Sequence, residues 1–152
     1  MLLAGASSAS AYVQIDSRCI LRAYTPWSQN YTGPYYVSGE VDCSGNSYPV
    51  PSQIEVCSQV YNSSTNQWYT VSGSCAETNV ITEYVNQLTI LESGVCGHEY
   101  RTWDWGYLAD DGASATYTSS GYVNCTQPAT PTEAPAGSAS QAVQPTPGLE
   151  PK

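Results

Sequence analysis

The residues of this chain with the most definite chemistry are its six cysteines, spread over most of the 152 residues: Cys19, Cys43, Cys57, Cys75, Cys96 and Cys125. An even number of cysteines in a short chain is typical of disulfide bonds formed outside the reducing cytosol. A zinc or iron–sulfur site is the alternative, but the sequence has no C-x-x-C pair, and its single histidine, His98, lies two residues after Cys96. Metal-ligand spacing is therefore absent, and we predict disulfides, no metal and no cofactor.

The expected turns predict which cysteines pair. Turn-forming residues cluster at 30–33, 62–66 and 110–112, and residues that face each other across a hairpin have a nearly constant sum of residue numbers. Each turn brings two consecutive cysteines close together, which favours sequential pairing. The predicted bonds are Cys19–Cys43, Cys57–Cys75 and Cys96–Cys125. A bond that joins two different sheets is the main alternative.

An aromatic run is the best candidate for a binding site. On a β-strand, Arg101, Trp103, Trp105 and Tyr107 point to the same face. If exposed, this row forms a platform on which sugar rings stack. If buried, it is the central strand of the core. The chain has 13 Tyr and 4 Trp but no Phe, so its core needs such residues. We therefore expect the row to be buried, with the platform as the alternative.

Catalytic signals are sparse. His98 is the only histidine, so any proton-transfer or triad chemistry has to use it. No serine stands in a G-x-S-x-G frame, and spacing cannot reveal a glycosidase-type carboxylate pair. Asp104, Asp110 and Asp111 do not match the calcium-loop pattern, so we expect a solvated turn there. We predict that the protein is not an enzyme; the alternative is a small secreted hydrolase that uses His98 or a carboxylate pair.

Strand patterns predict the elements that position these residues. Alternating apolar and polar residues mark strands at 35–43, 53–61, 67–72, 100–108 and 115–124, and Pro26 is expected to end a strand at 17–24. Segment 78–91 has apolar residues at helical spacing, but its β-branched residues favour a strand. Six to eight short strands predict an all-β, antiparallel, two-sheet sandwich.

The chain divides into three parts. Residues 1–11 end in the A-x-A pattern Ala9-Ser10-Ala11 and are interpreted as the remnant of a signal peptide. Residues 12–126 form the β-sandwich domain. Residues 127–152 are rich in Pro, Thr and Ala and are expected to be a disordered tail. N-glycosylation sequons begin at Asn30, Asn62 and Asn124.

Charge and hydropathy exclude several partners. The formal net charge of −9 disfavours binding to nucleic acid and to anionic lipid. No stretch of about 18 apolar residues follows the N-terminus, so we expect no membrane span. The protein is predicted to be secreted, and either extracellular or associated with the cell surface.

Two segments resemble a family of small secreted proteins. They are Val56-Cys57-Ser58-Gln59 with Trp68-Tyr69-Thr70-Val71 and Cys75, and the run Cys96-Gly97-His98-Glu99-Tyr100-Arg101-Thr102-Trp103. Together they resemble the disulfide-bonded β-sandwich proteins of Gram-positive soil bacteria. The resemblance implies an immunoglobulin-like fold and no particular activity.

These observations predict a secreted, non-catalytic binding or structural module. We expect it to recognise an extracellular protein or glycan surface, or to associate with itself through edge strands such as 67–72. A secreted protease inhibitor, with an exposed loop anchored by disulfides, is a further alternative besides the hydrolase.

Overall fold

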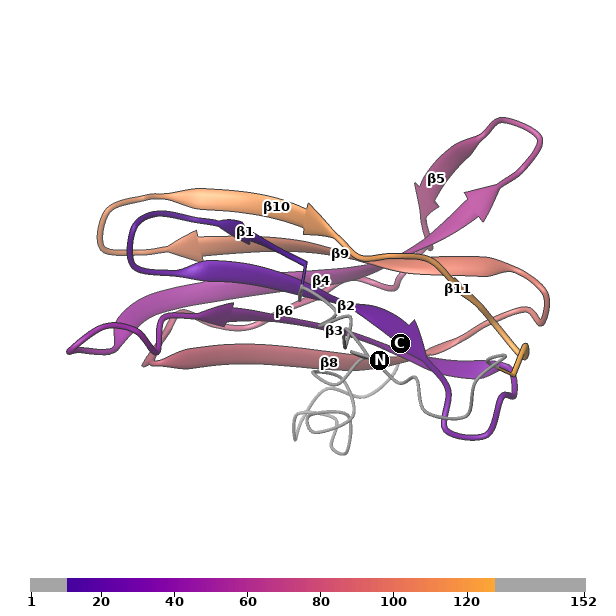
Figure 1. The fold of residues 1–152 in the computed structure, drawn as a ribbon, viewed down its shortest axis with the longest axis horizontal. Coiled ribbons are helices and arrows are strands. Elements are labelled where there is room, and N and C mark those ends of the chain that lie inside the picture. The colour runs from indigo at the N-terminus through magenta and orange to yellow at the C-terminus, as the bar shows by residue number, and fades with distance from the viewer. Residues whose placement is uncertain (1–10, 128–152) are drawn as a thin grey trace, which may run out of the picture.

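A computed structural model describes residues 11–127 of the chain, and within that range all regular secondary structure is β-strand. The strands form two sheets that lie over one another as two layers (Figure 1). The prediction of an all-β, two-sheet architecture is confirmed. The expected signal-peptide remnant at 1–11, apart from Ala11, and the expected tail at 127–152, apart from Gln127, lie outside the described residues.

Sheet A has four strands in the order β1-β2-β3-β8, and every neighbouring pair is antiparallel. Its strands are β1 (Tyr12–Gln14), β2 (Ile20–Trp27), β3 (Pro34–Asp42) and β8 (Val85–Ser93). The expectation that Pro26 ends the first long strand is wrong, because β2 continues to Trp27. A shift in register between Tyr24 and Trp27 accommodates the proline, which has no N–H to donate to a ladder.

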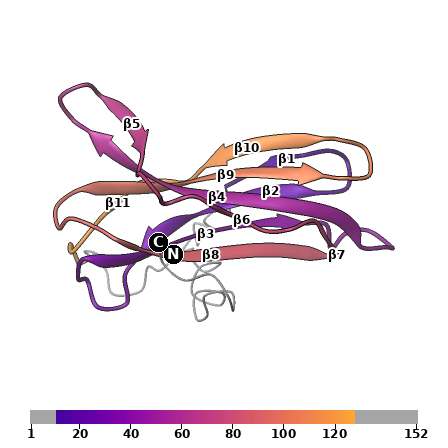
Figure 2. The same ribbon diagram turned by 180° about the vertical axis from the view of Figure 1, so that it is seen from behind.

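Sheet B has seven strands built on the order β10-β9-β4-β5, with β6 and β7 also paired to β4 and β11 paired to β9. Its strands are β4 (Val50–Asn62), β5 (Gln67–Thr70), β6 (Ala76–Glu77), β7 (Ile81–Glu83), β9 (Glu99–Leu108), β10 (Ser114–Thr118) and β11 (Tyr122–Val123). The ambiguous segment 78–91 is extended, as expected. It contributes β7 to one sheet and β8 to the other, which Figure 2 shows from behind.

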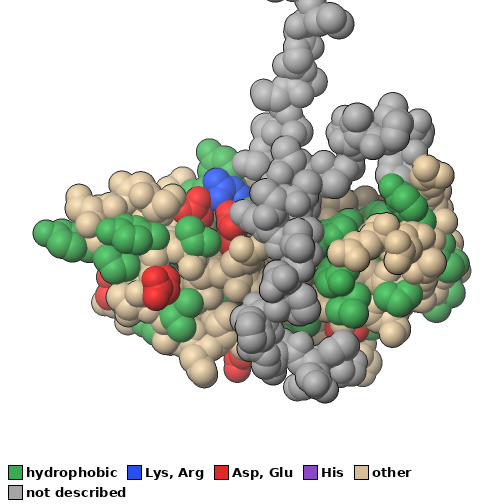
Figure 3. Space-filling view, turned by 90° about the horizontal axis from the view of Figure 1, so that it is seen from below, with side chains coloured by type: hydrophobic (Ala, Val, Ile, Leu, Met, Phe, Trp, Pro, Cys, Tyr) green, Lys and Arg blue, Asp and Glu red, His purple; other side chains and the backbone are tan. Residues whose placement is uncertain are grey.

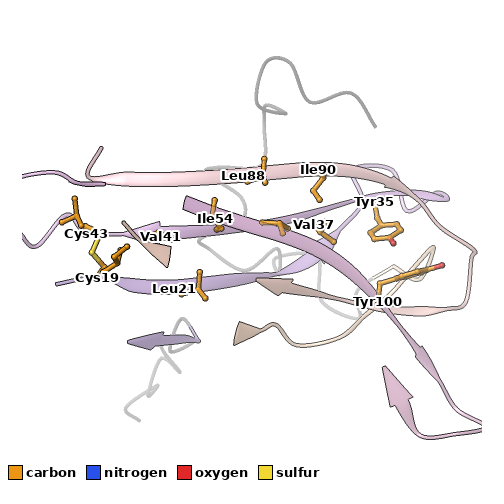
Figure 4. Close-up of a cluster of buried hydrophobic side chains, with 13 residues drawn as sticks. Cys19, Leu21, Tyr35, Val37, Val41, Cys43, Ile54, Leu88, Ile90 and Tyr100 are labelled. Carbon is orange, nitrogen blue, oxygen red and sulfur yellow. A yellow bond between two sulfur atoms is a disulfide. The ribbon is translucent and has the colours of Figure 1, made fainter. Parts of the chain in front are cut away.

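The core lies between the two sheets. Leu21, Val37, Val41 and Leu88 of sheet A are fully buried there, as is Ile54 of sheet B, which faces them from the other layer (Figure 4). At one end of the core the rings of Tyr35 and Tyr100 stack with centroids 4.4 Å apart. The Tyr35 hydroxyl shares a hydrogen bond of 2.7 Å with the hydroxyl of Ser58, and burial raises the pKa of Tyr35. A buried tyrosine thus fills volume and still satisfies its polar end.

The disulfides follow the predicted sequential pairing. Cys19 bonds to Cys43, Cys57 to Cys75 and Cys96 to Cys125, and no described cysteine is free. The first bond joins the residue before β2 to the residue after β3, at one end of sheet A, and the other two join residues of sheet B or of the loops beside it. The alternative of a bond between sheets is therefore wrong. The hydrophobic core, rather than a covalent bond, holds the two layers together.

Candidate functional site

The row Arg101, Trp103, Trp105 and Tyr107 lies on the face of sheet B that points away from sheet A. Strand β9 alternates strictly, with buried residues at every second position and half-buried residues between them. The buried positions, which include Tyr100 and Leu108, fill the space between the sheets. The expectation that the aromatic row forms the core is therefore wrong. The core is filled from the opposite face of the same strand.

Neighbouring strands extend this row into a larger surface. The register places Gln59 of β4 beside Arg101, and on the far side of β4 it places Trp68 beside Tyr61. Paired residues point to the same side of a sheet, so all of these side chains face outward. We call this set the outward aromatic surface: Tyr61, Trp68, Arg101, Trp103, Trp105 and Tyr107.

Specific contacts order the outward aromatic surface. The Trp105 and Tyr107 rings are almost parallel, at 8°, with centroids 5.5 Å apart. The Arg101 guanidinium carbon lies 4.5 Å from the centre of the Trp68 ring, and its Nε donates a 2.8 Å hydrogen bond to Oε1 of Gln59. Partial burial lowers the pKa of Arg101, although an arginine stays protonated in proteins. These contacts hold several of the side chains in defined orientations.

An open cleft of about 780 Å³ lies next to this surface, where β4 and β9 separate. The ladder between the two strands ends at Val60 and Tyr100. Beyond that point β4 continues with β5 as a hairpin that rises away from both layers (Figures 1 and 2). The cleft is lined by residues of this hairpin, of β11, and of the start of β9 with the segment before it, among them Tyr61, Tyr69, His98 and Glu99.

The cleft brings together three residue types that could support hydrolysis, namely Ser63, His98 and Glu99. Nucleophilic catalysis requires the nucleophile, the base and its orienting group to be within hydrogen-bond reach. Among the described residues, no hydrogen bond joins the His98 ring to Ser63 or to a carboxylate. His98 is exposed, and its ring centroid lies 6.5 Å from that of Tyr100. The arrangement presents polar groups to a ligand without aligning a triad.

The acidic residues near the β9–β10 turn do not form one cluster. Asp110 and Asp111 both contact the guanidinium of Arg18, which also binds Asp16. The ion pairs join the β1–β2 turn to the β9–β10 turn, and hydrogen bonds from Arg18 lower the pKa of Asp110. Asp104 lies elsewhere, because it is fully buried between the sheets. The turn at 110–112 is exposed to solvent, as expected, and Arg18 holds its two aspartates.

Asp104 is the most unusual buried group of the described chain. Neither of its carboxyl oxygens has a hydrogen-bond partner among the described residues. Burial, with a smaller contribution from the charge of Glu40, raises its pKa well above the ordinary value. Glu40 lies on the other face of β3, where it pairs with Arg22. A neutral Asp104 avoids placing an unpaired charge in the core.

Two further groups do not form the sites that their residue types suggest, namely a metal site at Glu55 beside a disulfide and a glycosylation site at the sequon asparagine Asn124. Glu55 lies close to the sulfur atoms of Cys57 and Cys75, but these sulfurs are bonded to each other and cannot act as thiolate ligands. Of the three sequons, the one at Asn124 has a fully buried asparagine whose amide donates a hydrogen bond to the carbonyl of Gly33. That side chain is not accessible for glycosylation in the folded protein.

Comparisons with known proteins give no assignment. No protein-family model matches the chain, and no curated protein matches it in sequence. Among the described residues there is no helix long and apolar enough to span a membrane. On the face viewed in Figure 3, basic side chains lie beside acidic ones, and uncharged side chains cover most of the surface that is coloured.

The sequence pattern predicts part of the outward aromatic surface. The alternation of 101–107 predicted correctly that these residues share one face of the strand. Whether that face points into the core or away from it depends on which face of β9 packs against the other sheet. The inward positions include Thr102, Asp104 and Gly106, which are poor indicators of a core. Tyr61 and the cleft were missed, because both depend on where β4 separates from β9. The alternation of β4, extended past the turn to Trp68, was a usable signal for Tyr61.

Proposed function

We propose that the protein is an extracellular, non-catalytic binding module that recognises a glycan through the outward aromatic surface. The observation that carries the proposal is that Trp103, Trp105 and Tyr107 lie outside the core, on the outward face of sheet B, where polar side chains of β4 neighbour two of the three rings. Aromatic side chains on such a face offer apolar area to the C–H faces of sugar rings. The three disulfides suit an oxidising compartment.

The polar neighbours of the aromatic rings support a glycan over an apolar partner. Gln53 lies beside Tyr107, Glu55 beside Trp105 and Gln59 beside Arg101. These side chains supply donors and acceptors to hydroxyl groups next to Tyr107, Trp105 and Arg101, as small-molecule sites do. The net charge of −9 favours a neutral or cationic glycan over an acidic one. An immunoglobulin-like arrangement of the strands, implied by the resemblance, remains a prediction.

A glycan array probed with the oxidised full chain tests the proposal. We expect binding to a neutral glycan that is lost in the Trp103→Ala/Trp105→Ala double variant while the far-ultraviolet circular dichroism spectrum is retained. Tyr48→Ala is the matched control, because Tyr48 is 79% exposed and lies in the β3–β4 connection. Equal binding by the double variant and the wild type would contradict the proposal.

Self-association through an edge strand is the second candidate. The expected edge strand at 67–72 is β5, and it lies at an edge of sheet B. The edge strand β8 of sheet A is longer, and only one of its nine residues, Glu92, is charged. Long uncharged edges are prone to pair with another chain. Light scattering coupled to size exclusion tests this candidate, since a monomer at every concentration would contradict it.

A further inference from the structure

The cleft between β4 and β9 has two rigid walls. One wall is the segment before β9, which the Cys96–Cys125 bond ties to the chain after β11. Backbone hydrogen bonds from Gly97 N to Asn124 O and from Asn124 N to His98 O, both 2.9 Å, fix it further. Gly97 has a φ of 86°, which a residue with a side chain adopts only with strain. His98 is therefore presented from a fixed backbone.

The opposite wall is the β4–β5 hairpin. The Cys57–Cys75 bond closes its base, and its tip is a turn in which Oδ1 of Asn62 accepts a 2.9 Å hydrogen bond from Ser64 N. The Tyr61 hydroxyl donates a 2.9 Å bond to Oδ1 of Asn66. Two of the three disulfides thus hold the walls of this cleft. A site that is ordered before binding loses less entropy when its ligand arrives.

The residues that line the cleft favour an uncharged ligand that has apolar faces and hydrogen-bonding groups. Tyr61, Tyr69 and His98 supply aromatic rings, while Glu99 and Asn62 supply acceptor and donor groups. Its lining contains no lysine or arginine, so an anionic ligand would have no counter-charge. The volume of about 780 Å³ lies within the range of about 300–1,000 Å³ typical of small-molecule sites.

The cleft also continues the outward aromatic surface. Tyr61 belongs to both. Its ring centroid lies 5.2 Å from that of Trp68, and the Arg101 guanidinium group lies over the Trp68 ring. Glu99 precedes Arg101 by two residues on β9 and therefore points to the same side of the sheet. Tyr61 and Glu99 thus form the side of the cleft that adjoins the outward aromatic surface, whereas Tyr69, which pairs with Val60, lines its other side.

We infer that the cleft between β4 and β9 binds one neutral saccharide unit at the end of a glycan chain, with Tyr69 and His98 as its contact residues. This inference rests on the proposed function in one respect, namely that the glycan chain runs from the outward aromatic surface to the cleft. The cleft has its own walls and its own reporter residue, so the two ideas can fail separately.

A single nuclear magnetic resonance titration distinguishes binding in the cleft from binding on the outward aromatic surface. The chain has one histidine and 4 tryptophans, so the imidazole signals of His98 report on the cleft, and the indole N–H signals of Trp103 and Trp105 report on the outward aromatic surface. Trp27, which stacks on Tyr36 in sheet A, is the internal control. The probes are soluble neutral hexasaccharides of glucose, xylose, mannose and N-acetylglucosamine, added to the oxidised full chain.

We expect the His98 and Trp105 signals to shift with the same dissociation constant, while the Trp27 signal stays in place. Tyr69→Ala should weaken binding about tenfold, and Tyr48→Ala should leave it unchanged. Shifts of the tryptophans without His98 would overturn the cleft site and leave the proposed function standing. A shift of His98 alone would support the cleft and contradict the outward aromatic surface.

Two remaining outcomes overturn the inference outright. If no probe shifts either reporter at millimolar concentration, neither the cleft nor the surface binds a neutral glycan. If a probe is shortened during the titration and His98→Ala abolishes the cleavage, the cleft is catalytic, and the non-catalytic function is wrong as well.

Discussion

The carboxyl group of Asp104 lies directly against the Cα of Gly39 on the opposite sheet. A Cβ atom at position 39 would overlap the three atoms of that carboxyl group. Asp104 is fully buried, so its carboxyl group cannot turn out into solvent. The two layers approach closely at this point because one residue lacks a side chain. Gly39 therefore has a packing role, whereas a glycine in a strand usually weakens it.

Gly39→Ala should destabilise the protein strongly, by about 2–4 kcal/mol, since overpacking and a displaced buried carboxyl act together. The cost should be much smaller in an Asp104→Ala background, where the obstacle has been removed. Urea unfolding of the two single variants and the double variant measures this coupling. Additive free energies would show that the two residues are not in contact.

Gly121→Ala is a matched contrast. A Cβ at position 121 would meet the end of the Glu99 side chain, but Glu99 is only half-buried and can turn away. We expect the free energy of unfolding to change by about 0.5 kcal/mol or less, as for other surface substitutions. Urea unfolding beside Gly39→Ala checks this, and a loss as large as that of Gly39→Ala would contradict the difference in burial.

Asp104 also predicts a pH dependence of stability. Its pKa is raised in the folded protein, so its contribution to stability is complete below the unfolded value of about 4 and declines as the pH rises towards the folded value. Asp104→Asn cannot ionise and lacks this decline. The stability of the wild type relative to this variant should fall by up to about 1.4 kcal/mol per pH unit over that range.

Unfolding of both proteins in urea from pH 4 to pH 8 measures that difference. Two other shifted carboxyl groups remain in both proteins, so their contributions cancel. They are Glu92, whose pKa is raised by burial, and Asp42, in which the effect of burial is outweighed by hydrogen bonds from Ser44 and Arg22 that lower the pKa. Parallel stability curves would mean that Asp104 is solvated or paired in the folded state.

The Cys57–Cys75 bond should matter for binding as well as for stability. Replacing both cysteines by serine opens a loop with a sequence separation of 18 and should cost about 3 kcal/mol in the chain-entropy model. It should also weaken glycan binding, because the β4–β5 hairpin carries Trp68 and Tyr69. Denaturation and binding are measured on the same preparations.

Cys19→Ser/Cys43→Ser is the control for that experiment. This bond spans a separation of 24 within sheet A, so its loss should reduce stability by a similar amount and leave binding unchanged. Equal loss of binding in both double variants would indicate general loosening rather than a specific effect on the hairpin.

The sequence predicted the fold through local signals. Turn residues at 62–66 and 110–112 placed the hairpins, and the hairpins placed the cysteines, so the pairing of Cys96 with Cys125 followed from chain geometry. The direction of the aromatic row was not predictable in this way. Asp104 and Thr102 occupy inward positions of β9, where apolar residues are expected. Burial of Asp104 depends on the absence of a side chain at Gly39. Burial of Thr102 depends on the hydrogen bond that its hydroxyl donates to the backbone carbonyl of Tyr24.

Two further features of the fold could not be predicted from neighbouring residues in the sequence. Pro26 is compatible with β2 only because the register with β3 shifts there. The division of 78–91 between two sheets depends on β4, which pairs with Ile81–Glu83 and leaves Val85–Ser93 to pair with β3. Both features are set by partners that are distant in the sequence.

The most direct test of an outward-facing binding row is the free energy of unfolding of Trp105→Ala, compared with that of Tyr100→Ala on the inward face of the same strand. If Trp105 faces solvent, its removal should cost less than about 2 kcal/mol and abolish glycan binding, while Tyr100→Ala should cost about 3–5 kcal/mol. A loss of 3–5 kcal/mol for Trp105→Ala, or full binding by that variant, would contradict the placement or the role of the row.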